Sequence, residues 1–431
     1  MAEVTERSAS MALILGAMAA GALLGWLARA GGPLDGLQLV AFGGFLGAAF
    51  LNLLKMLVVP LVIASIIAGV AGMGGLRDLG RLGGLAFSYY LVTTLLAVVL
   101  ALLFVNGIAP GIIDGEPAGR LLALHTDSGA VAASVQGQAG RSLGDVLLGL
   151  IPANLFEAAA GTRLVGLIFF GLLFGYCITQ LEPPLRDTLA NFWQATFQVM
   201  MRMTGYVMRL TPLGVFGLTL KVAAEAGLDA ARPLLLFALC VVASLAVYAV
   251  VVLPLLMRLA GIRRPWAIFP ALAPALLTAF STASSSATMP LTLDCLQRRA
   301  GVSARVSGFV LPLGTSVNHA GSALYECAAA LFIAQAYGLH LSLPTQLVVV
   351  LLALLTSMGI AGIPAASLVG ITVILAAVGL PVEAVGVLLV LDRLLDMLRT
   401  GVNVLADAVG TTIVARLTGE KAVLAPGEDG A

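Results

Sequence analysis

Long apolar stretches separated by short polar segments dominate this chain. Several of them exceed the roughly 20 residues that one helix needs to cross a bilayer, and they contain Pro or Gly, which is typical of broken or re-entrant helices. Hydrophobic residues make up 60% of the 431 positions and charged residues only 10%. The pattern therefore predicts an all-α membrane protein with many spans. The apolar stretches lie near residues 11–28, 38–73, 84–108, 162–180, 190–220, 233–257, 306–334, 346–378 and 382–415.

Positive charges predict the orientation of these segments, because Lys and Arg concentrate on the cytoplasmic side of membrane proteins. Arginines flank residues 266–294 on both sides, so we expect this segment to enter and leave from the cytoplasm as a hairpin. Residues 346–378 lack positive charge on both flanks and are predicted to form a hairpin from the opposite side. Two hairpins of opposite entry form an inverted repeat, with which secondary transporters build a site near the membrane centre. The residues marking the cytoplasmic side are Arg77, Arg81, Arg258, Arg263, Arg264, Arg298, Arg299, Arg305, Arg416 and Lys421.

A polar stripe interrupts the last apolar stretch, between Asp392 and Asp407. On a helix its members project within an arc of about 100° and extend over about 22 Å. A charge at the membrane centre costs about 2.5 to 3.5 kcal/mol on insertion scales, so such a stripe indicates a functional site. A structural ion-pair seam between helices is the alternative interpretation. The stripe consists of Asp392, Asp396, Arg399, Thr400, Asn403 and Asp407.

Helix-breaking or hydroxyl residues mark three further apolar segments. Residues 281–290 are rich in Ser and Thr and end in Pro, and residues 357–367 contain two Gly and a Pro. Residues 311–322 place Pro, two Gly and Asn in mid-helix, so we expect this segment to be unwound. Free carbonyl and amide groups at such breaks can bind cations and carboxylates.

Charge and cysteine content narrow the functional classes. The net charge of +1 shows no nucleic-acid-binding footprint. The first apolar stretch lacks a small-residue cleavage signature, so we expect a retained helix, with both termini cytoplasmic. Four cysteines without CxxC spacing indicate reduced core residues rather than metal ligands or disulfides. They are Cys177, Cys240, Cys295 and Cys327.

Five motifs together carry a resemblance to a known family: Leu54–Pro60, Ser284–Ser286 with Met289 and Pro290, Ala323–Glu326 leading to Phe332–Gln335, Ala361–Pro364, and Asp396–Asp407. They resemble the dicarboxylate/amino acid:cation symporter family, which includes glutamate transporters, over about residues 10–417. The resemblance implies the glutamate-transporter fold, with eight transmembrane helices plus two re-entrant helical hairpins in inverted repeats. It also implies a homotrimer in the lipid bilayer of the cell inner (plasma) membrane, with a mobile transport domain that slides against a scaffold as an elevator.

The same resemblance divides the chain into parts. The scaffold would comprise residues 1–83, with helices 1 and 2, and residues 111–231, with an extracellular loop and helices 4 and 5. The transport domain would comprise residues 84–110, which form helix 3, and residues 232–416. The latter would contain helix 6, hairpin 1 at 266–294, helix 7, hairpin 2 at 346–378 and helix 8. Residues 417–431 are expected to be a disordered tail.

The resemblance also implies a substrate for the stripe. Arg399 would bind the substrate's side-chain carboxylate, for which a planar guanidinium is suited, and Asp396 would hold its amino group. Family members that carry plain dicarboxylates lack the acid at 396, and carriers of neutral amino acids lack the arginine at 399. Both together imply L-aspartate or L-glutamate, with neither favoured. The other implied substrate contacts are Ala283, Ser284, Ser285, Ser322, Gly362, Ile363, Thr400 and Asn403.

Charge balance independently predicts symport. Asp396, Arg399 and Asp407 sum to −1, and an acidic amino acid adds −1, so the loaded site would bury about two uncompensated negative charges. Cations should therefore accompany the substrate, either H⁺ or Na⁺, and no other cofactor is expected. The sodium ligands implied by the resemblance are Tyr90, Thr93, Thr94, Gly314, Ser316, Asn318, Ser357, Met358, Ile360, Asn403 and Asp407.

Two departures from the family pattern affect coupling and gating. The usual Asn-Met-Asp-Gly-Thr reads Asn318-His319-Ala320-Gly321-Ser322 here, so a sodium-binding carboxylate and a thioether are missing. Glu326 stands where proton-coupled relatives have their proton-carrying glutamate, so we expect mainly proton-driven import, with His319 as a second titratable group or a structural residue. Ala283 and Met397 occupy the two positions at which relatives keep a partner arginine, and Arg393 is the candidate substitute.

Other functions remain as alternatives. A sodium-coupled aspartate/glutamate or C4-dicarboxylate symporter is the nearest one. An anion channel should show a ring of basic residues, whereas only Arg393 and Arg399 lie deep. An intramembrane aspartyl protease would use Asp392 and Asp396 as a dyad that shares a proton, but Arg399 beside Asp396 favours ionisation. We therefore do not expect an enzyme.

Overall fold

The computed structural model describes residues 2–29, 36–72, 76–122, 151–160, 164–225, 227–359 and 366–420, with isolated positions between 124 and 135 and residues 423 and 424. The chain is mostly helical, and within these residues the only strands are the two-residue β1 (Ile112–Ile113) and β2 (Glu116–Pro117), which pair antiparallel. The predicted all-α class is confirmed. The expected substrate contacts Gly362 and Ile363, and the expected sodium ligand Ile360, lie outside the described residues.

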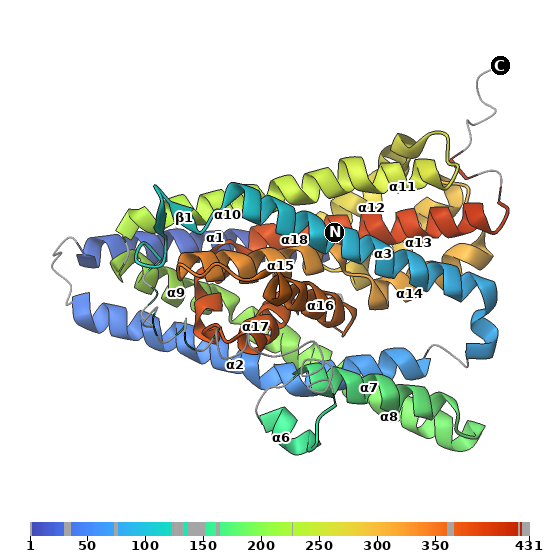
Figure 1. The fold of residues 1–431 in the computed structure, drawn as a ribbon, viewed down its shortest axis with the longest axis horizontal. Helices are drawn as coiled ribbons and strands as arrows, with labels where there is room; N and C mark the ends of the chain where they lie inside the picture. Colours follow the sequence, from blue (N-terminus) through green and yellow to red (C-terminus); the bar gives the residue numbers. More distant parts are fainter. Residues whose placement is uncertain are drawn as a thin grey trace.

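One group of helices comes from the N-terminal half of the chain: α1 (Ala2–Arg29), α2 (Gly36–Gly72), α6 (Leu155–Ala160), α7 (Leu164–Thr179), α8 (Pro183–Arg209) and α9 (Thr211–Glu225). Helices α1 and α2 pack on α9, and α2 also packs on α7 and α8. Glycine permits the close approach of α1 to α9, because a Cβ at Gly25 would lie 2.4 Å from the carbonyl oxygen of Leu220. Figure 1 shows α2, α7 and α8 along one side of the molecule and α10 and α11 along the other.

The second group contains α3 and the helices of the C-terminal half. Its members are α3 (Leu76–Ile108), α10 (Ala231–Val247), α11 (Leu253–Leu259), α12 (Ile268–Thr282), α13 (Ser285–Arg298), α14 (Ala304–Val317), α15 (Ala320–Ala336), α16 (Leu343–Gly359), α17 (Ala366–Val378) and α18 (Val385–Leu417). Helix α15 is buried along almost its whole length and packs on α3, α16, α17 and α18. A helix that is apolar on every side needs such a central position. It therefore holds α18 and the polar stripe inside this group.

Helices α12 and α13 form the first predicted helix pair, packing on each other and on α18. The chain turns at Ala283, whose φ of 49° is left-handed, and the Ser284 hydroxyl caps α13 by accepting from the Ala287 N–H. Helices α16 and α17 also pack on each other, and the residues that join them, 360–365, lie outside the described part. The two pairs lie close to the boundaries expected from the charge pattern.

The predicted unwinding of residues 311–322 is wrong over most of its length. Helix α14 continues through Pro312 and Gly314 to Val317, and only Asn318 and His319 leave the helix before α15 begins. A proline removes only one backbone hydrogen bond, and the packing of α14 on α18 and α13 stabilises the remaining turns. The break is therefore confined to two residues.

Three helical segments of the described chain are long and apolar enough to cross a membrane by themselves: Leu82–Ile108, Ala231–Leu259 and Pro265–Thr282. A fourth arises if Pro183–Val207 and Thr211–Glu225, which are bent by 52°, form one span.

A π-helical turn at Tyr248–Val252 separates α10 from α11 and was not expected from the sequence. The Leu253 N–H donates to the carbonyl oxygen of Tyr248, five residues back. Pro254 explains the widened turn, because its ring would clash with the carbonyl group of Val250 in a regular α-helix.

Part of the predicted tail packs on the folded chain. The Leu424 N–H donates to the Ala300 carbonyl oxygen at 2.9 Å, and Ser303 donates to the carboxylate of Glu420. All four cysteines are free, but Cys177 is exposed rather than part of the core.

We expect Ala283→Gly to stabilise the protein by up to about 1 kcal/mol. A left-handed residue with a Cβ costs about 1–2 kcal/mol, from which the loss of one buried methyl group is subtracted. Thermal unfolding in detergent measures the change. The control is Ala287→Gly, inside α13, which should destabilise by about 0.5–1 kcal/mol. A loss of stability in both variants would contradict the assigned turn.

Candidate functional site

The guanidinium group of Arg399 on α18 lies at the centre of the polar stripe and is fully buried. Its Nη2 donates to Oδ1 of Asp392 at 3.0 Å and to Oδ1 of Asp396 at 2.9 Å. The guanidinium carbon lies 3.8 Å from the centre of the Tyr325 ring, a cation–π contact from α15. Nε and Nη1 are buried without a hydrogen-bond partner. Nη2 of the guanidinium group is therefore held in place, whereas Nε and Nη1 are available to a carboxylate.

The sequence placed Asp392 in the stripe and in the alternative protease dyad, but it gave this residue no part in substrate binding. Asp392 lies seven residues before Arg399, two helical turns away on the same face, so the spacing was a usable signal. Arg393, the candidate partner for Asp396, has a buried Nε without a hydrogen-bond partner.

Asn403 joins the stripe to the break between α14 and α15. Its Oδ1 accepts from the Gly321 N–H at 2.8 Å, and its Nδ2 donates to the Ser322 hydroxyl at 3.2 Å. A Cβ at Gly321 would lie 2.9 Å from the carbonyl oxygen of Arg399, so only glycine allows this approach of the two helices. The N-terminal turn of α15 thus lies against the middle of the stripe.

Five of the expected sodium ligands meet around Asp407. Asn318 Nδ2 donates to Asp407 Oδ1 at 2.8 Å, and the Thr94 hydroxyl donates to Asn318 Oδ1 at 3.0 Å. A Cβ on Gly314 would lie 2.5 Å from the Tyr90 hydroxyl and 2.9 Å from Asp407 Oδ1. These oxygens come from α3, from Asn318 in the break after α14 and from α18, which makes the cluster a candidate cation site.

The remaining expected sodium ligands are placed differently. The Thr93 hydroxyl donates within its own helix, and the exposed Ser316 hydroxyl donates to the Pro312 carbonyl oxygen. The Ser357 carbonyl oxygen lies 3.1 Å from His319 Nδ1, which must therefore carry the proton of this hydrogen bond. His319 thus donates a hydrogen bond to a carbonyl oxygen that the resemblance assigned to a sodium site. The side chain of Met358 lies outside the described part.

Glu326 on α15 is fully buried between helices of the second pair. Its Oε2 accepts from the Thr356 hydroxyl on α16 at 2.6 Å, and Oε1 has no hydrogen-bond partner. A Cβ on Gly370 of α17 would lie 2.3 Å from the carboxyl carbon, so the carboxyl group packs directly on the backbone of α17.

The first helix pair contributes buried residues at its turn. Ala283 and Ser285 are buried, whereas Ser284 is half-buried and caps α13. Thr400 is buried beside Arg399 on α18, 5% exposed. Because α12 and α13 both pack on α18, the fold brings this turn to the same helix that carries the stripe.

The profile of the sodium:dicarboxylate symporter family matches residues 11–417 of this sequence. The chain belongs to this family. It is therefore a membrane transporter and not an enzyme.

Relatives with known activities cover most of the chain. A proton/glutamate-aspartate symporter of Escherichia coli (strain K12) is 33% identical over 370 residues, which are 86% of this chain and 84% of that protein. A proton/sodium-glutamate symport protein of Bacillus caldotenax is 33% identical over 87% of both chains. A neutral amino acid transporter B(0) of Oryctolagus cuniculus is also 33% identical, over 92% of this chain and 78% of that protein. Relatives at equal identity thus differ in substrate and in coupling ion.

Proposed function

We propose that this protein imports acidic amino acids by cation symport and that protons are the main coupling ion. The observation that carries the proposal is Glu326, a fully buried carboxyl group with one oxygen on Thr356 and the other without a partner. Burying an ionised carboxylate without a cation is costly, so a neutral acid is the favoured form in this closed arrangement. A group that must be protonated here, and can lose the proton when water reaches it, suits a proton carrier.

The sodium-coupled alternative is supported by the cluster around Asp407. Asp407, Asn318, Thr94 and Tyr90 bring side-chain oxygens together, and the Gly314 backbone packs against Tyr90 and Asp407. Against it, Ala320 removes the further carboxylate, and the Ser357 carbonyl group is bonded to His319. We therefore propose that sodium coupling is reduced or absent.

Substrate selection is assigned to Arg399 and its neighbours. The unpartnered Nε and Nη1 of Arg399 would bind the side-chain carboxylate of the substrate. Asp396, which is held by Nη2, would accept a hydrogen bond from the amino group of the substrate. Thr400, Asn403 and Ser322 would add hydrogen bonds, and the Ala283–Ser285 turn with Gly362 and Ile363 would enclose the other carboxylate. L-aspartate and L-glutamate both satisfy these contacts.

The proposal extends to architecture. We assign eight transmembrane helices and two re-entrant hairpins, with residues 1–83 and 111–231 as scaffold and residues 84–110 and 232–416 as transport domain. The packing of α1 and α2 on α9, and of α2 on α7 and α8, supports this division. The protein would be a trimer in the inner membrane, with both termini cytoplasmic, and would move as an elevator.

Uptake into proteoliposomes with separately imposed gradients tests the coupling ion. An inward pH gradient alone should drive accumulation of labelled L-aspartate, and Glu326→Gln should abolish that accumulation while exchange of internal for external L-aspartate continues. Glutamine keeps the shape of the protonated acid but cannot release a proton. The control is Gln335→Glu, in the same helix, which should leave pH-driven uptake in place. Accumulation that requires sodium, or that survives in Glu326→Gln, would show that proton coupling through this residue is wrong.

A further inference from the structure

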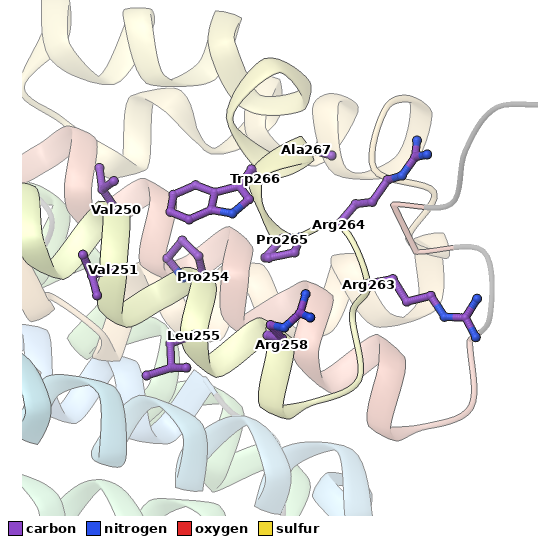
Figure 2. A pocket seen from close by; sticks show the side chains of 10 residues that line it. All are labelled: Val250, Val251, Pro254, Leu255, Arg258, Arg263, Arg264, Pro265, Trp266 and Ala267. Atoms are coloured by element: carbon purple, nitrogen blue, oxygen red, sulfur yellow. The ribbon is translucent and has the colours of Figure 1, made fainter.

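A groove of about 590 Å³ lies at the end of the α10–α11 helix, and none of the residues assigned to substrate or coupling ion lines it. Figure 2 shows the Trp266 indole beside Val250 and Pro254, the Arg258 side chain next to Pro265, and Arg263 and Arg264 extending from the connecting loop. The full lining is Val250, Val251, Pro254, Leu255, Arg258, Arg263, Arg264, Pro265, Trp266 and Ala267.

The walls of this groove are apolar and face outward. Val250, Val251, Leu255 and Trp266 are 45%, 53%, 54% and 55% exposed. The groove is flanked by two segments, Ala231–Leu259 and Pro265–Thr282, that are long and apolar enough to cross a membrane. Side chains of this kind on the outer surface of a membrane helix contact lipid chains, and a tryptophan at the end of a span lies at the level of the headgroups.

Three positive charges gather at the loop end of the groove. Arg258, Arg263 and Arg264 are exposed, and among the described residues no ion pair joins any of them to a carboxylate. Their donors are therefore free for a ligand, and a guanidinium fork matches phosphate oxygens. About 12 Å of helix separates Val250 from Arg258, so the charged end and the apolar wall are stacked along the direction of a span.

We propose that the groove binds an anionic phospholipid, with its phosphate on Arg258, Arg263 and Arg264 and an acyl chain along Val250, Val251 and Leu255. Charge complementarity identifies the headgroup, because a zwitterionic lipid would leave three positive charges uncompensated. The apolar wall identifies a lipid rather than a free phosphate ion, since an ion would not use it. Basic pockets between membrane helices on the cytoplasmic side are suited to such headgroups, and the arginine pattern predicts that side here. This lipid site does not depend on whether H⁺ or Na⁺ drives uptake.

Quenching of Trp266 fluorescence by brominated lipids tests this site directly. The chain has three tryptophans, so Trp26→Phe/Trp193→Phe leaves Trp266 as the only one. In phosphatidylcholine vesicles, chain-brominated phosphatidylglycerol should reach half-maximal quenching at a mole fraction about fivefold or more below that of brominated phosphatidylcholine, the factor expected from a single effective arginine contact. Equal quenching by the two lipids would overturn the proposal.

Matched variants separate a site from general surface charge. The change Arg258→Gln/Arg263→Gln/Arg264→Gln should remove the preference for phosphatidylglycerol. The control Arg298→Gln/Arg299→Gln/Arg305→Gln removes the same charge from the same predicted side and should retain it. An equal loss in both would overturn the proposal in favour of diffuse attraction. Leu255→Gln should weaken quenching by brominated phosphatidylglycerol, and 10-fold excess inorganic phosphate over the lipid should not displace it. Full displacement by phosphate would indicate an anion site only.

Discussion

We expect Arg399→Gln to lower the uptake of L-aspartate and L-glutamate by at least about 100-fold. The change leaves Asp392 and Asp396 buried without their cation and removes the donors for the substrate carboxylate. Removing one partner of a buried ion pair costs about 3–5 kcal/mol, and each 1.4 kcal/mol corresponds to a factor of ten. Uptake of labelled substrates into proteoliposomes measures the loss, and uptake of L-serine should rise relative to L-aspartate.

Two further substitutions test whether the loss of uptake is specific to the guanidinium group of Arg399. Arg399→Lys keeps the charge but loses the planar fork, so it should restore folding stability without restoring wild-type affinity for acidic amino acids. Arg416→Gln removes a partly buried arginine from the last turn of the same helix, nine residues beyond Asp407, and should leave uptake within about twofold of wild type, since this side chain lies outside the stripe. If Arg399→Gln accumulated L-aspartate like the wild type, the substrate assignment would be wrong.

Gly370→Ala should reduce both stability and pH-driven uptake, although it adds only a methyl group. The new Cβ would lie 2.3 Å from the carboxyl carbon of Glu326 and 2.5 Å from both of its oxygens, closer than any real contact. Either α17 moves away or Glu326 rotates and loses its hydrogen bond with Thr356. Overpacking of this kind costs about 1–3 kcal/mol, which thermal unfolding in detergent would detect.

A double-mutant cycle isolates this contact. Glu326→Ala removes the group that the new methyl would strike, so Gly370→Ala should cost much less in that background, with a coupling energy of about 0.5–3 kcal/mol. Gly308→Ala is the control, because a Cβ there would meet no atom within 4 Å. It should be neutral or stabilise α14 by up to about 1 kcal/mol. Additive effects of the first two changes would contradict the packing of Glu326 on α17.

Local patterns in the sequence predicted much of this site. The stripe on α18 follows from helical periodicity alone, and the structure buries all six of its members. The turn at Ala283 and the break at Asn318 and His319 were predicted from Ser, Pro and Gly content, although the break is shorter than expected. Helix-breaking composition shows where a helix can end, but tertiary packing decides where it does end.

Contacts between distant segments could not be predicted in the same way. The hydrogen bond between His319 and the Ser357 carbonyl group joins residues 38 positions apart, and no periodicity relates them. The packing of Glu326 on Gly370 likewise depends on how α15 and α17 approach each other. Helical periodicity places Asp392 on the same face as Arg399, but the family pattern assigns a substrate contact to Asp396 and none to Asp392.

The π turn at Tyr248–Val252 holds one residue more than a regular helical turn, and the wider turn takes up that residue locally. Each residue of an α-helix advances the chain by about 100°, so an extra residue in a regular helix would rotate everything after it by that angle. The π turn absorbs this rotation, so Leu255 and Arg258 can line the same groove as Val250 and Val251 in the turn itself. Deleting one residue here would bring the Pro254 ring against the carbonyl group four residues before it, so we expect a kink rather than a regular helix between the two ends of the groove.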